Sequence, residues 1–191
     1  MRLSDLIRKI ENALIGKKRQ RAAPEQAAAP KPESMEERIE GLRRRGVRIG
    51  EGCMLFTTFF STEPYLVDIG NRVGISGGTK FLTHDASVWL IRPERPHAQV
   101  LGRIRVGDNT FIGEDCIILP GTTIGAGCVV AAGSVVRGDI PDNSIVLGNP
   151  GRVIGQASML KGAHTLLDRV LDTYHLPEPE REAVIRRHFG L

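Results

Sequence analysis

The feature that most limits how this chain can fold is an aliphatic side chain at every sixth position. In the longest run these residues are Val106, Ile112, Ile118, Ile124, Val130 and Val136. Four positions after each of the first five comes a small residue, namely Thr110, Cys116, Thr122, Cys128 or Ser134. The same spacing recurs earlier in the chain, at Ile49 and Leu55 and again at Ile69, Ile75 and Phe81.

A period of six matches neither the 3.6-residue period of a helix nor the alternation of a single strand. If the chain turns a corner every six residues, all of these side chains lie inside a three-sided prism, and one full turn takes 18 residues. Glycines such as Gly107, Gly113 and Gly125 fit the corners. The repeat therefore predicts an all-β solenoid over residues 47–155.

The positive charge of the chain is concentrated near its N-terminus. Residues 1–46 contain 12 Lys and Arg against 7 Asp and Glu, whereas the other 145 residues contain 14 against 15. The predicted prism therefore lacks the basic surface that nucleic-acid binding requires. No apolar run approaches the roughly 20 residues of a membrane-spanning helix, and the first residues lack the apolar segment of a signal peptide. We expect a cytoplasmic protein.

Both ends of the chain are expected to be helical. Residues 1–46 predict a basic amphipathic helix over 3–15, a flexible linker and a short capping helix over about 35–45. Two alternatives remain for residues 1–21: peripheral contact with an anionic membrane surface, or docking on a protein partner. Residues 156–191 predict a helix over about 157–174 and a last helix near the C-terminus.

The three cysteines all fall in the small inward position of a hexad. Cys116 and Cys128 are 12 residues apart, so they lie on different sides of the prism, and together with Cys53 they match no zinc-binding spacing. We expect all three to be buried small residues, and we expect no metal site.

The repeat has a long interruption after Phe81. The sequence T-H-D at 83–85 places His84 at an outward corner and puts Asp85 where a small inward residue belongs. The pattern then fails over an excursion at 86–105. A loop of that length inside a repeat domain is usually functional, so we expect the active site here.

A neutral imidazole at an exposed corner can accept a proton from a hydroxyl group, which makes His84 the candidate general base. Three roles remain open for Asp85: orienting the imidazole, binding a substrate, or satisfying the backbone of the loop. His97 lies within the excursion and could contact a substrate. The histidines of the C-terminal part are expected to face solvent; they are His164, His175 and His188.

The hexads and the closing stretch A-A-G-S-V-V-R-G-D-I-P-D-N-S-I-V-L-G-N-P-G-R-V-I at 131–154 resemble the hexapeptide-repeat acyltransferase superfamily. The closing stretch is similar to the sugar and xenobiotic O-acetyltransferase branch, which includes the galactoside, maltose and polysaccharide acetyltransferases. This resemblance implies a left-handed parallel β-helix and a homotrimer with its active sites in the clefts between prisms. It also implies acetyl-CoA as the acyl donor, a carbohydrate acceptor, and direct transfer with His84 as the base.

The resemblance further indicates where acetyl-CoA binds. The implied donor-site residues are Ala132, Gly133, Ser134, Arg137 and Arg152. The first three match a stretch where small residues let the pantetheine arm approach the backbone. Family members commonly place a lysine where this chain has Gly138, which leaves the two arginines as candidate contacts to the nucleotide phosphates.

The sequence thus predicts O-acetylation of a sugar hydroxyl, in the setting of surface polysaccharide biosynthesis. N-acetylation of an amino sugar is the main alternative, because the same base would serve. A γ-class carbonic anhydrase shares the prism but needs three histidine ligands, and only His84 and His97 fall in the repeat region. A non-catalytic scaffold is the last alternative, since solenoids often act as binding surfaces.

Overall fold

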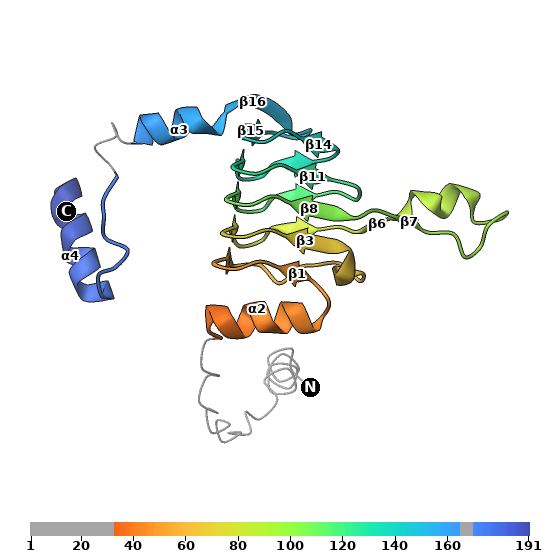
Figure 1. Ribbon diagram of the computed structural model, residues 1–191, viewed down its shortest axis with the longest axis horizontal. Helices are drawn as coiled ribbons and strands as arrows, with labels where there is room; N and C mark the ends of the chain where they lie inside the picture. Colours follow the sequence, from red (N-terminus) through yellow and green to blue (C-terminus); the bar gives the residue numbers. More distant parts are fainter. Residues whose placement is uncertain (1–32, 165–169) are drawn as a thin grey trace, which may run out of the picture. The chain divides into compact units, whose positions relative to one another are not determined.

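The computed structural model describes residues 33–164 and 170–191. Its core is a stack of short parallel strands through which the chain winds, one sheet after the next (Figure 1). The helix expected over 3–15, the linker after it and the proposed contact segment 1–21 lie outside the described residues.

Three parallel sheets form the sides of the stack. Sheet A contains β1 (Arg48–Ile49), β3 (Val67–Ile69), β8 (Ile104–Val106), β11 (Thr123–Ile124) and β14 (Asp139–Ile140). Sheet B contains β2 (Met54–Leu55), β4 (Gly74–Ile75), β9 (Phe111–Ile112), β12 (Val129–Val130), β15 (Ser144–Leu147) and the antiparallel β16 (Arg152–Gln156). Sheet C contains β5 (Lys80–Phe81), β10 (Ile117–Ile118) and β13 (Val135–Val136).

The register of the strands shows the predicted coil length. Ile124 pairs with Val106, and Val129 pairs with Phe111, so each residue lies beside the one 18 positions earlier. The hexad positions fill the interior, because every aliphatic residue of the long run is at most 4 % exposed. The aromatic rings of Phe60 and Phe81 stack with their centroids 4.7 Å apart.

The small position of each hexad has a hydrogen-bonding role as well as a steric one. Thr110 Oγ1 donates to the carbonyl of Gly125 at 2.9 Å, and Cys128 Sγ donates to that of Pro141 at 3.1 Å. A threonine, serine or cysteine fits this position because it is small and can donate to an otherwise unpaired carbonyl of the adjacent coil. This explains why the position is occupied by Thr, Cys or Ser along the repeat.

All three cysteines are buried and free, as the sequence predicted. Burial raises the pKa of the Cys116 and Cys128 thiols, which makes them poor nucleophiles. Within residues 33–164 and 170–191, no three His, Cys, Asp or Glu side chains are grouped in a way that could hold a metal ion.

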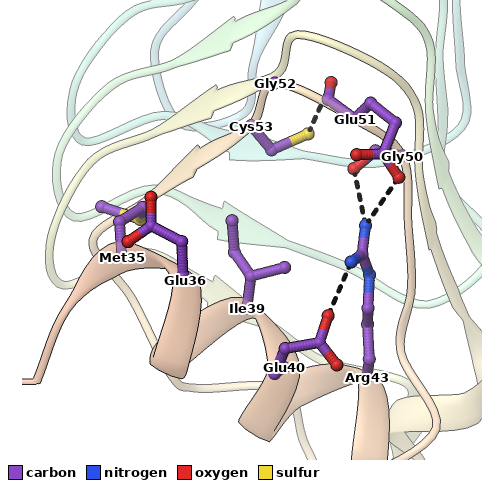
Figure 2. Close-up of a pocket in the computed structure, with 9 residues that line it drawn as sticks. All are labelled: Met35, Glu36, Ile39, Glu40, Arg43, Gly50, Glu51, Gly52 and Cys53. Atoms are coloured by element: carbon purple, nitrogen blue, oxygen red, sulfur yellow. Dashed lines mark hydrogen bonds and ion pairs between the residues drawn. The ribbon is translucent and has the colours of Figure 1, made fainter.

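Helix α2 (Met35–Arg44) covers the first coil, at the place where the sequence predicted a capping helix. Ser34 and Glu37 form a capping box at its N-terminus. Arg43 Nη2 donates to the carbonyl of Gly50 at 3.1 Å (Figure 2). The same nitrogen donates to the carbonyl of Ile49 at 2.8 Å. These bonds satisfy backbone acceptors that the first coil would otherwise leave unpaired at the open end of the stack.

The break in the repeat forms an arm that projects from the stack (Figure 1). It begins and ends in an antiparallel pair, β6 (His84–Asp85) and β7 (Val100–Leu101), and a 3₁₀ helix η2 (Ala86–Ile91) lies between them. Val106 pairs with Ile69, 37 positions earlier instead of 18, so the arm adds 19 residues to one coil. The coil resumes at Ile104, which is fully buried.

The C-terminal part contains helices α3 (Ala157–His164) and α4 (Glu178–Phe189). The prediction of a single helix over about 157–174 is wrong at its C-terminal end, because residues 170–173 are not helical. Apolar spacing continued through Val170 and Leu171, but spacing alone does not fix where a helix ends. Among the described residues, no helix has the length and apolar character needed to cross a bilayer.

Candidate active site

His84 lies at the corner between sheets C and A, where the arm leaves the stack. The chain reaches this corner through Thr83, which is fully buried, and His84 then pairs with Leu101 at the base of the arm. The imidazole is 43 % exposed. The backbone of His84 is therefore held by the stack, while its imidazole ring is accessible to a ligand.

A carboxylate that the sequence pattern did not indicate holds this imidazole. Glu63 lies in the equivalent corner of the preceding coil, before the 3₁₀ helix η1 (Pro64–Leu66), and its Oε2 is 2.9 Å from His84 Nδ1. Two hydroxyls also donate to Glu63: Thr62 Oγ1 at 2.7 Å and Thr83 Oγ1 at 2.8 Å. The Glu63 side chain is only 14 % exposed, so its position is well defined.

The same contacts keep Glu63 ionised. The hydrogen bond from Thr62, then that with His84, and then that from Thr83 lower the pKa of the Glu63 carboxyl to about 2, against the opposing effect of burial. An ionised carboxylate can only accept hydrogen bonds. Ser61 Oγ and Thr62 Oγ1 also lie 3.2 and 3.3 Å from Nδ1, but the charge on Glu63 makes it the stronger partner.

This partner determines which ring nitrogen of His84 is free. With Nδ1 donating its hydrogen to Glu63, the neutral imidazole leaves the lone pair of Nε2 available to accept a proton. A histidine oriented by a largely enclosed, ionised acid in this way is the arrangement of a general base. The geometry can thus remove a proton from a hydroxyl or an amine bound beside His84.

The structure places Asp85 in contact with the arm and with the coil two strands farther along sheet C. Its carboxylate accepts a hydrogen bond from the backbone of Ser87 at 2.8 Å, capping η2, and pairs with Arg137 at 3.5 Å. These contacts lower the pKa of the Asp85 carboxyl, with the hydrogen bonds of Ser87 as the main cause. The residue that orients His84 is therefore Glu63, and Asp85 fixes the base of the arm.

A pocket of about 360 Å³ borders His84 on its sheet C side. It is lined by Arg45, Thr58, Phe59, Phe60, Ser61, Thr62, Leu82 and His84. The ring of Phe59 is 49 % exposed beside two hydroxyls. An aromatic surface next to hydroxyl groups suits a ligand with one apolar face and polar edges.

The residues expected to contact the donor lie at different places on the stack. Ala132 and Gly133 are exposed at the corner between sheets B and C, while Arg137 is exposed at the same corner as His84. Ser134 is fully buried, and its hydroxyl donates to the carbonyl of Ala131 at 2.6 Å. Arg152 lies on β16 in sheet B. Within one chain, only Arg137 shares a corner with the imidazole.

The arm carries exposed apolar side chains as well as charged ones. Trp89 and Leu90 are 76 % and 83 % exposed, and His97 lies farther along the arm beside Arg95 and Pro96. No contact between His97 and His84 is present in the described part of the chain.

A signal for Glu63 did exist in the sequence. Ile49 pairs with Ile69, 20 positions later, so the first coil carries two residues more than the regular 18. The additional residues fall at 61–66, which is the corner that stacks against His84. Two consecutive coils that both carry additional residues at the same corner therefore indicate which residues meet at that corner.

Comparison with known proteins identifies the family of the repeat. The family described as bacterial transferase hexapeptide (six repeats) matches residues 103–138. Protein CapG of Staphylococcus aureus is 48 % identical over 116 residues, which cover 59 % of this chain and 67 % of CapG.

Two solved structures share the fold. The hexapeptide-repeat acetyltransferase VCA0836 of Vibrio cholerae O1 biovar eltor, solved in complex with acetyl-CoA, has a TM-score of 0.51 and 31 % identity, covering 59 % of this chain and 61 % of that one. A maltose O-acetyltransferase of Clostridium difficile 630 has a TM-score of 0.52 and 27 % identity, covering 66 % and 78 %. The chain belongs to the hexapeptide-repeat acyltransferase superfamily, in the branch of the sugar and xenobiotic O-acetyltransferases.

Proposed function

We propose that this protein transfers the acetyl group of acetyl-CoA to a hydroxyl group of a sugar, with His84 as the general base. The observation that carries the proposal is the His84–Glu63 pair, whose 2.9 Å contact leaves Nε2 free at the edge of a pocket. Acetyl-CoA is the donor bound by the relative VCA0836, and maltose O-acetyltransferase supports a sugar hydroxyl as the acceptor.

The reaction can be written with this chain's own residues. Nε2 of His84 accepts the proton of the acceptor hydroxyl as its oxygen attacks the thioester carbonyl. Glu63 stabilises the imidazolium that forms, because its carboxylate is ionised and hydrogen-bonded to Nδ1. The tetrahedral intermediate then collapses, the C–S bond breaks, and the imidazolium returns its proton to the CoA thiolate. No covalent bond to the enzyme is required.

We assign the acceptor to the pocket beside His84. The exposed ring of Phe59 can lie against the apolar face of a sugar, and the hydroxyls of Ser61 and Thr62 can bond its edge. The donor is assigned to the coils on the other side of His84, toward Arg137. Because Gly138 stands where relatives commonly carry a lysine, Arg137 is the cation that we expect to meet the CoA phosphates.

The donor site is completed by assembly in this proposal. Ala132 and Gly133 lie one sheet away from the corner that carries His84, so one chain does not bring them together. A left-handed β-helix that associates as a trimer, as the family resemblance implies, would bring one prism's corner beside the next prism's sheet. We therefore propose that acetyl-CoA binds between two copies of the chain.

The test is a product assay with matched acceptors. Purified protein is incubated with acetyl-CoA and with pairs of sugars that differ only in carrying a hydroxyl or an amine. Mild base removes an acetyl ester but leaves an acetamide, so mass spectrometry before and after base separates the two products. A base-labile acetyl group on the hydroxyl sugar is expected. A base-stable product formed only on the amino sugar would replace the proposal with N-acetylation.

A further prediction concerns the positioning residue Glu63. Glu63→Gln is expected to lower kcat by about 10²- to 10⁴-fold, because an amide can donate to Nδ1 and thereby favours the tautomer that carries its hydrogen on Nε2. The KM for acetyl-CoA should change little, since among the described residues the Glu63 carboxylate bonds only to Thr62, Thr83 and His84. Glu114→Gln at an exposed corner is the matched control. An equal loss of activity in both variants would contradict the role of Glu63.

Glu63 also makes the stability of the protein depend on pH. Because the folded-state pKa is lowered to about 2, ionised Glu63 stabilises the fold fully above its unfolded pKa of about 4.5. This contribution is lost as the pH falls from about 4.5 to about 2. Urea unfolding of wild type and Glu63→Gln should therefore differ most above pH 4.5 and converge toward pH 2.

A further inference from the structure

Four charged residues meet on the outer face of sheet A. Strand pairing places Arg48, Asp68 and Arg105 directly beside one another on β1, β3 and β8. Arg103, just before β8, adds a third arginine: its Nε donates to Asp68 Oδ2 at 2.6 Å and its Nη2 contacts the same oxygen. Arg48 Nε pairs with the other oxygen, Oδ1.

The cluster has an excess of positive charge. Three guanidinium groups surround a single carboxylate, and the next position up the sheet, Thr123, is uncharged. Burial by itself would raise the pKa of Asp68, but hydrogen bonds from Arg48 and Arg103 outweigh it and hold that pKa below its usual range. Asp68 is therefore ionised at neutral pH, and the group retains a net charge of about +2.

Of the three arginines, Arg105 lies farthest from the Asp68 carboxylate. Arg105 Nε is 4.0 Å from Asp68, beyond hydrogen-bond length, and its side chain is 55 % exposed. Arg48 and Arg103 are 58 % and 46 % exposed, and they contact Asp68 through Nε of Arg48 and through Nε and Nη2 of Arg103. A guanidinium has five N–H donors and a carboxylate offers about four acceptor sites, so Asp68 cannot accept from every donor of three arginines. The unused donors point to an anion that the protein does not itself provide.

The cluster lies beside the candidate active site. Gly102 donates to the carbonyl of Thr83 at 2.8 Å, so Arg103 follows immediately after the residue that closes the base of the arm. His84 pairs with Leu101, two residues before Arg103. Two residues of strand span about 7 Å. The anion site thus begins two residues after the strand position that pairs with His84, and it continues along sheet A.

We infer that the acceptor carries a phosphate or diphosphate, and that Arg105, Arg48 and Arg103 bind it while the sugar hydroxyl lies at His84. This inference rests on the proposed function. Arginine binds phosphate through paired, charge-assisted N–H···O bonds, which matches donors gathered around a net positive charge. A nucleotide-linked sugar and a lipid-diphosphate-linked sugar present the same group, so both fit the site.

Two competing roles for the arginine cluster predict different results. If the cluster only fastens β1, β3 and β8 together, its loss should lower stability and not alter substrate preference. If it binds the phosphates of CoA, its loss should raise the KM for acetyl-CoA. The experiment therefore compares Arg105→Gln and Arg48→Gln with Arg72→Gln, an exposed arginine at another corner, between sheets A and B.

Binding is measured first, by calorimetric titration of each full-length protein with inorganic pyrophosphate. Wild type and Arg72→Gln should bind it alike, and Arg105→Gln should weaken binding by about 10-fold. Equal affinity in wild type and Arg105→Gln would overturn the proposal. This readout needs no turnover, so weakened binding without acetylation of any sugar would support the anion site and count against the proposed function alone.

Kinetics then test the acceptor. For each sugar, kcat/KM is measured with the methyl glycoside, the uridine diphosphate sugar, and the polyprenyl diphosphate sugar in detergent. Wild type should prefer at least one phosphate-bearing form by about 10-fold or more, and Arg105→Gln should remove that preference while changing the methyl glycoside less than about twofold. Comparing the uridine diphosphate sugar with the polyprenyl diphosphate sugar shows whether a nucleotide-linked or a lipid-linked sugar is the acceptor. Equal losses on neutral and charged acceptors, or a raised KM for acetyl-CoA only, would overturn the inference.

Discussion

Replacing His84 with alanine is expected to lower kcat for acetyl transfer by about 10²- to 10⁴-fold, the range that general bases contribute. The loss is expected because Nε2 of His84 is the proton acceptor. Glu63 cannot replace it as the base, because its oxygens are already bonded to Thr62 and Thr83. Binding of acetyl-CoA should be almost unchanged. The measurement is acceptor-dependent release of CoA at saturating substrates, with the thermal transition of each variant recorded alongside.

His97→Ala is the matched control, since this second histidine belongs to the same arm but has no contact with Glu63 among the described residues. It should retain most of the wild-type kcat. Wild-type rates in His84→Ala would show that the proton is removed elsewhere. Equal losses in both variants would mean that the arm as a whole, and not one imidazole, supports the reaction.

The second large effect is expected at a corner of the stack. A Cβ at Gly107 would lie 2.5 Å from the nitrogen of Ala126 and 2.6 Å from the carbonyl carbon of Gly125, which are backbone atoms of the next coil. That coil cannot move away without lengthening the 2.8 Å bond from Gly107 N to Ile124 O. We expect Gly107→Ala to lower the free energy of unfolding by about 3 kcal/mol, near the upper end for overpacked sites.

In a chain of this size, 1 kcal/mol corresponds to roughly 2–4 °C, so the Tm should fall by about 6–12 °C at constant protein concentration. Gly127→Asn is the control, because this corner has a φ of +64° and open space beyond it. Asn109 and Asn143 already adopt φ values of +55° and +56° at equivalent turns. The control should cost less than about 1 kcal/mol. A comparable loss in both variants would mean that backbone conformation, and not coil spacing, limits the glycine corners.

The repeating part of the fold could be predicted from the sequence because its cause is local and periodic. Each hexad aliphatic residue must be buried, and each small residue must fit beside a corner, so the same requirement recurs at Ile112, Ile118 and Ile124. The cysteines were correctly placed for the same reason. The capping helix could also be predicted, because Ser34 and Glu37 have the spacing of a capping box.

The candidate site could be predicted only in part. His84 was marked by the break in the repeat, but its partner Glu63 is 21 residues earlier and meets it only because consecutive coils stack. Contacts between coils depend on the register, and the register at this corner depends on how many additional residues each coil carries. The same limit applies to Asp68 and Arg103, which are 35 residues apart and become neighbours through the pairing of β3 and β8.

Asp85 illustrates the converse. Its adjacency to His84 made orienting the imidazole one of the three roles that the sequence left open for Asp85. In a β-strand, however, successive side chains point to opposite faces, so neighbours in sequence do not meet. Asp85 therefore faces Ser87 and Arg137, and the acid that contacts the imidazole comes from another coil.

The most direct test of the central claim is to determine which ring nitrogen of neutral His84 carries the hydrogen. Two-dimensional ¹⁵N NMR of histidine-labelled protein, with His84 assigned by comparison with His84→Ala, reports which ring nitrogen carries the hydrogen in the neutral form. We predict hydrogen on Nδ1, donated to Glu63 over 2.9 Å, and an unprotonated Nε2 ready to accept a proton. Hydrogen on Nε2, with Nδ1 accepting from Ser61 or Thr62, would contradict this prediction.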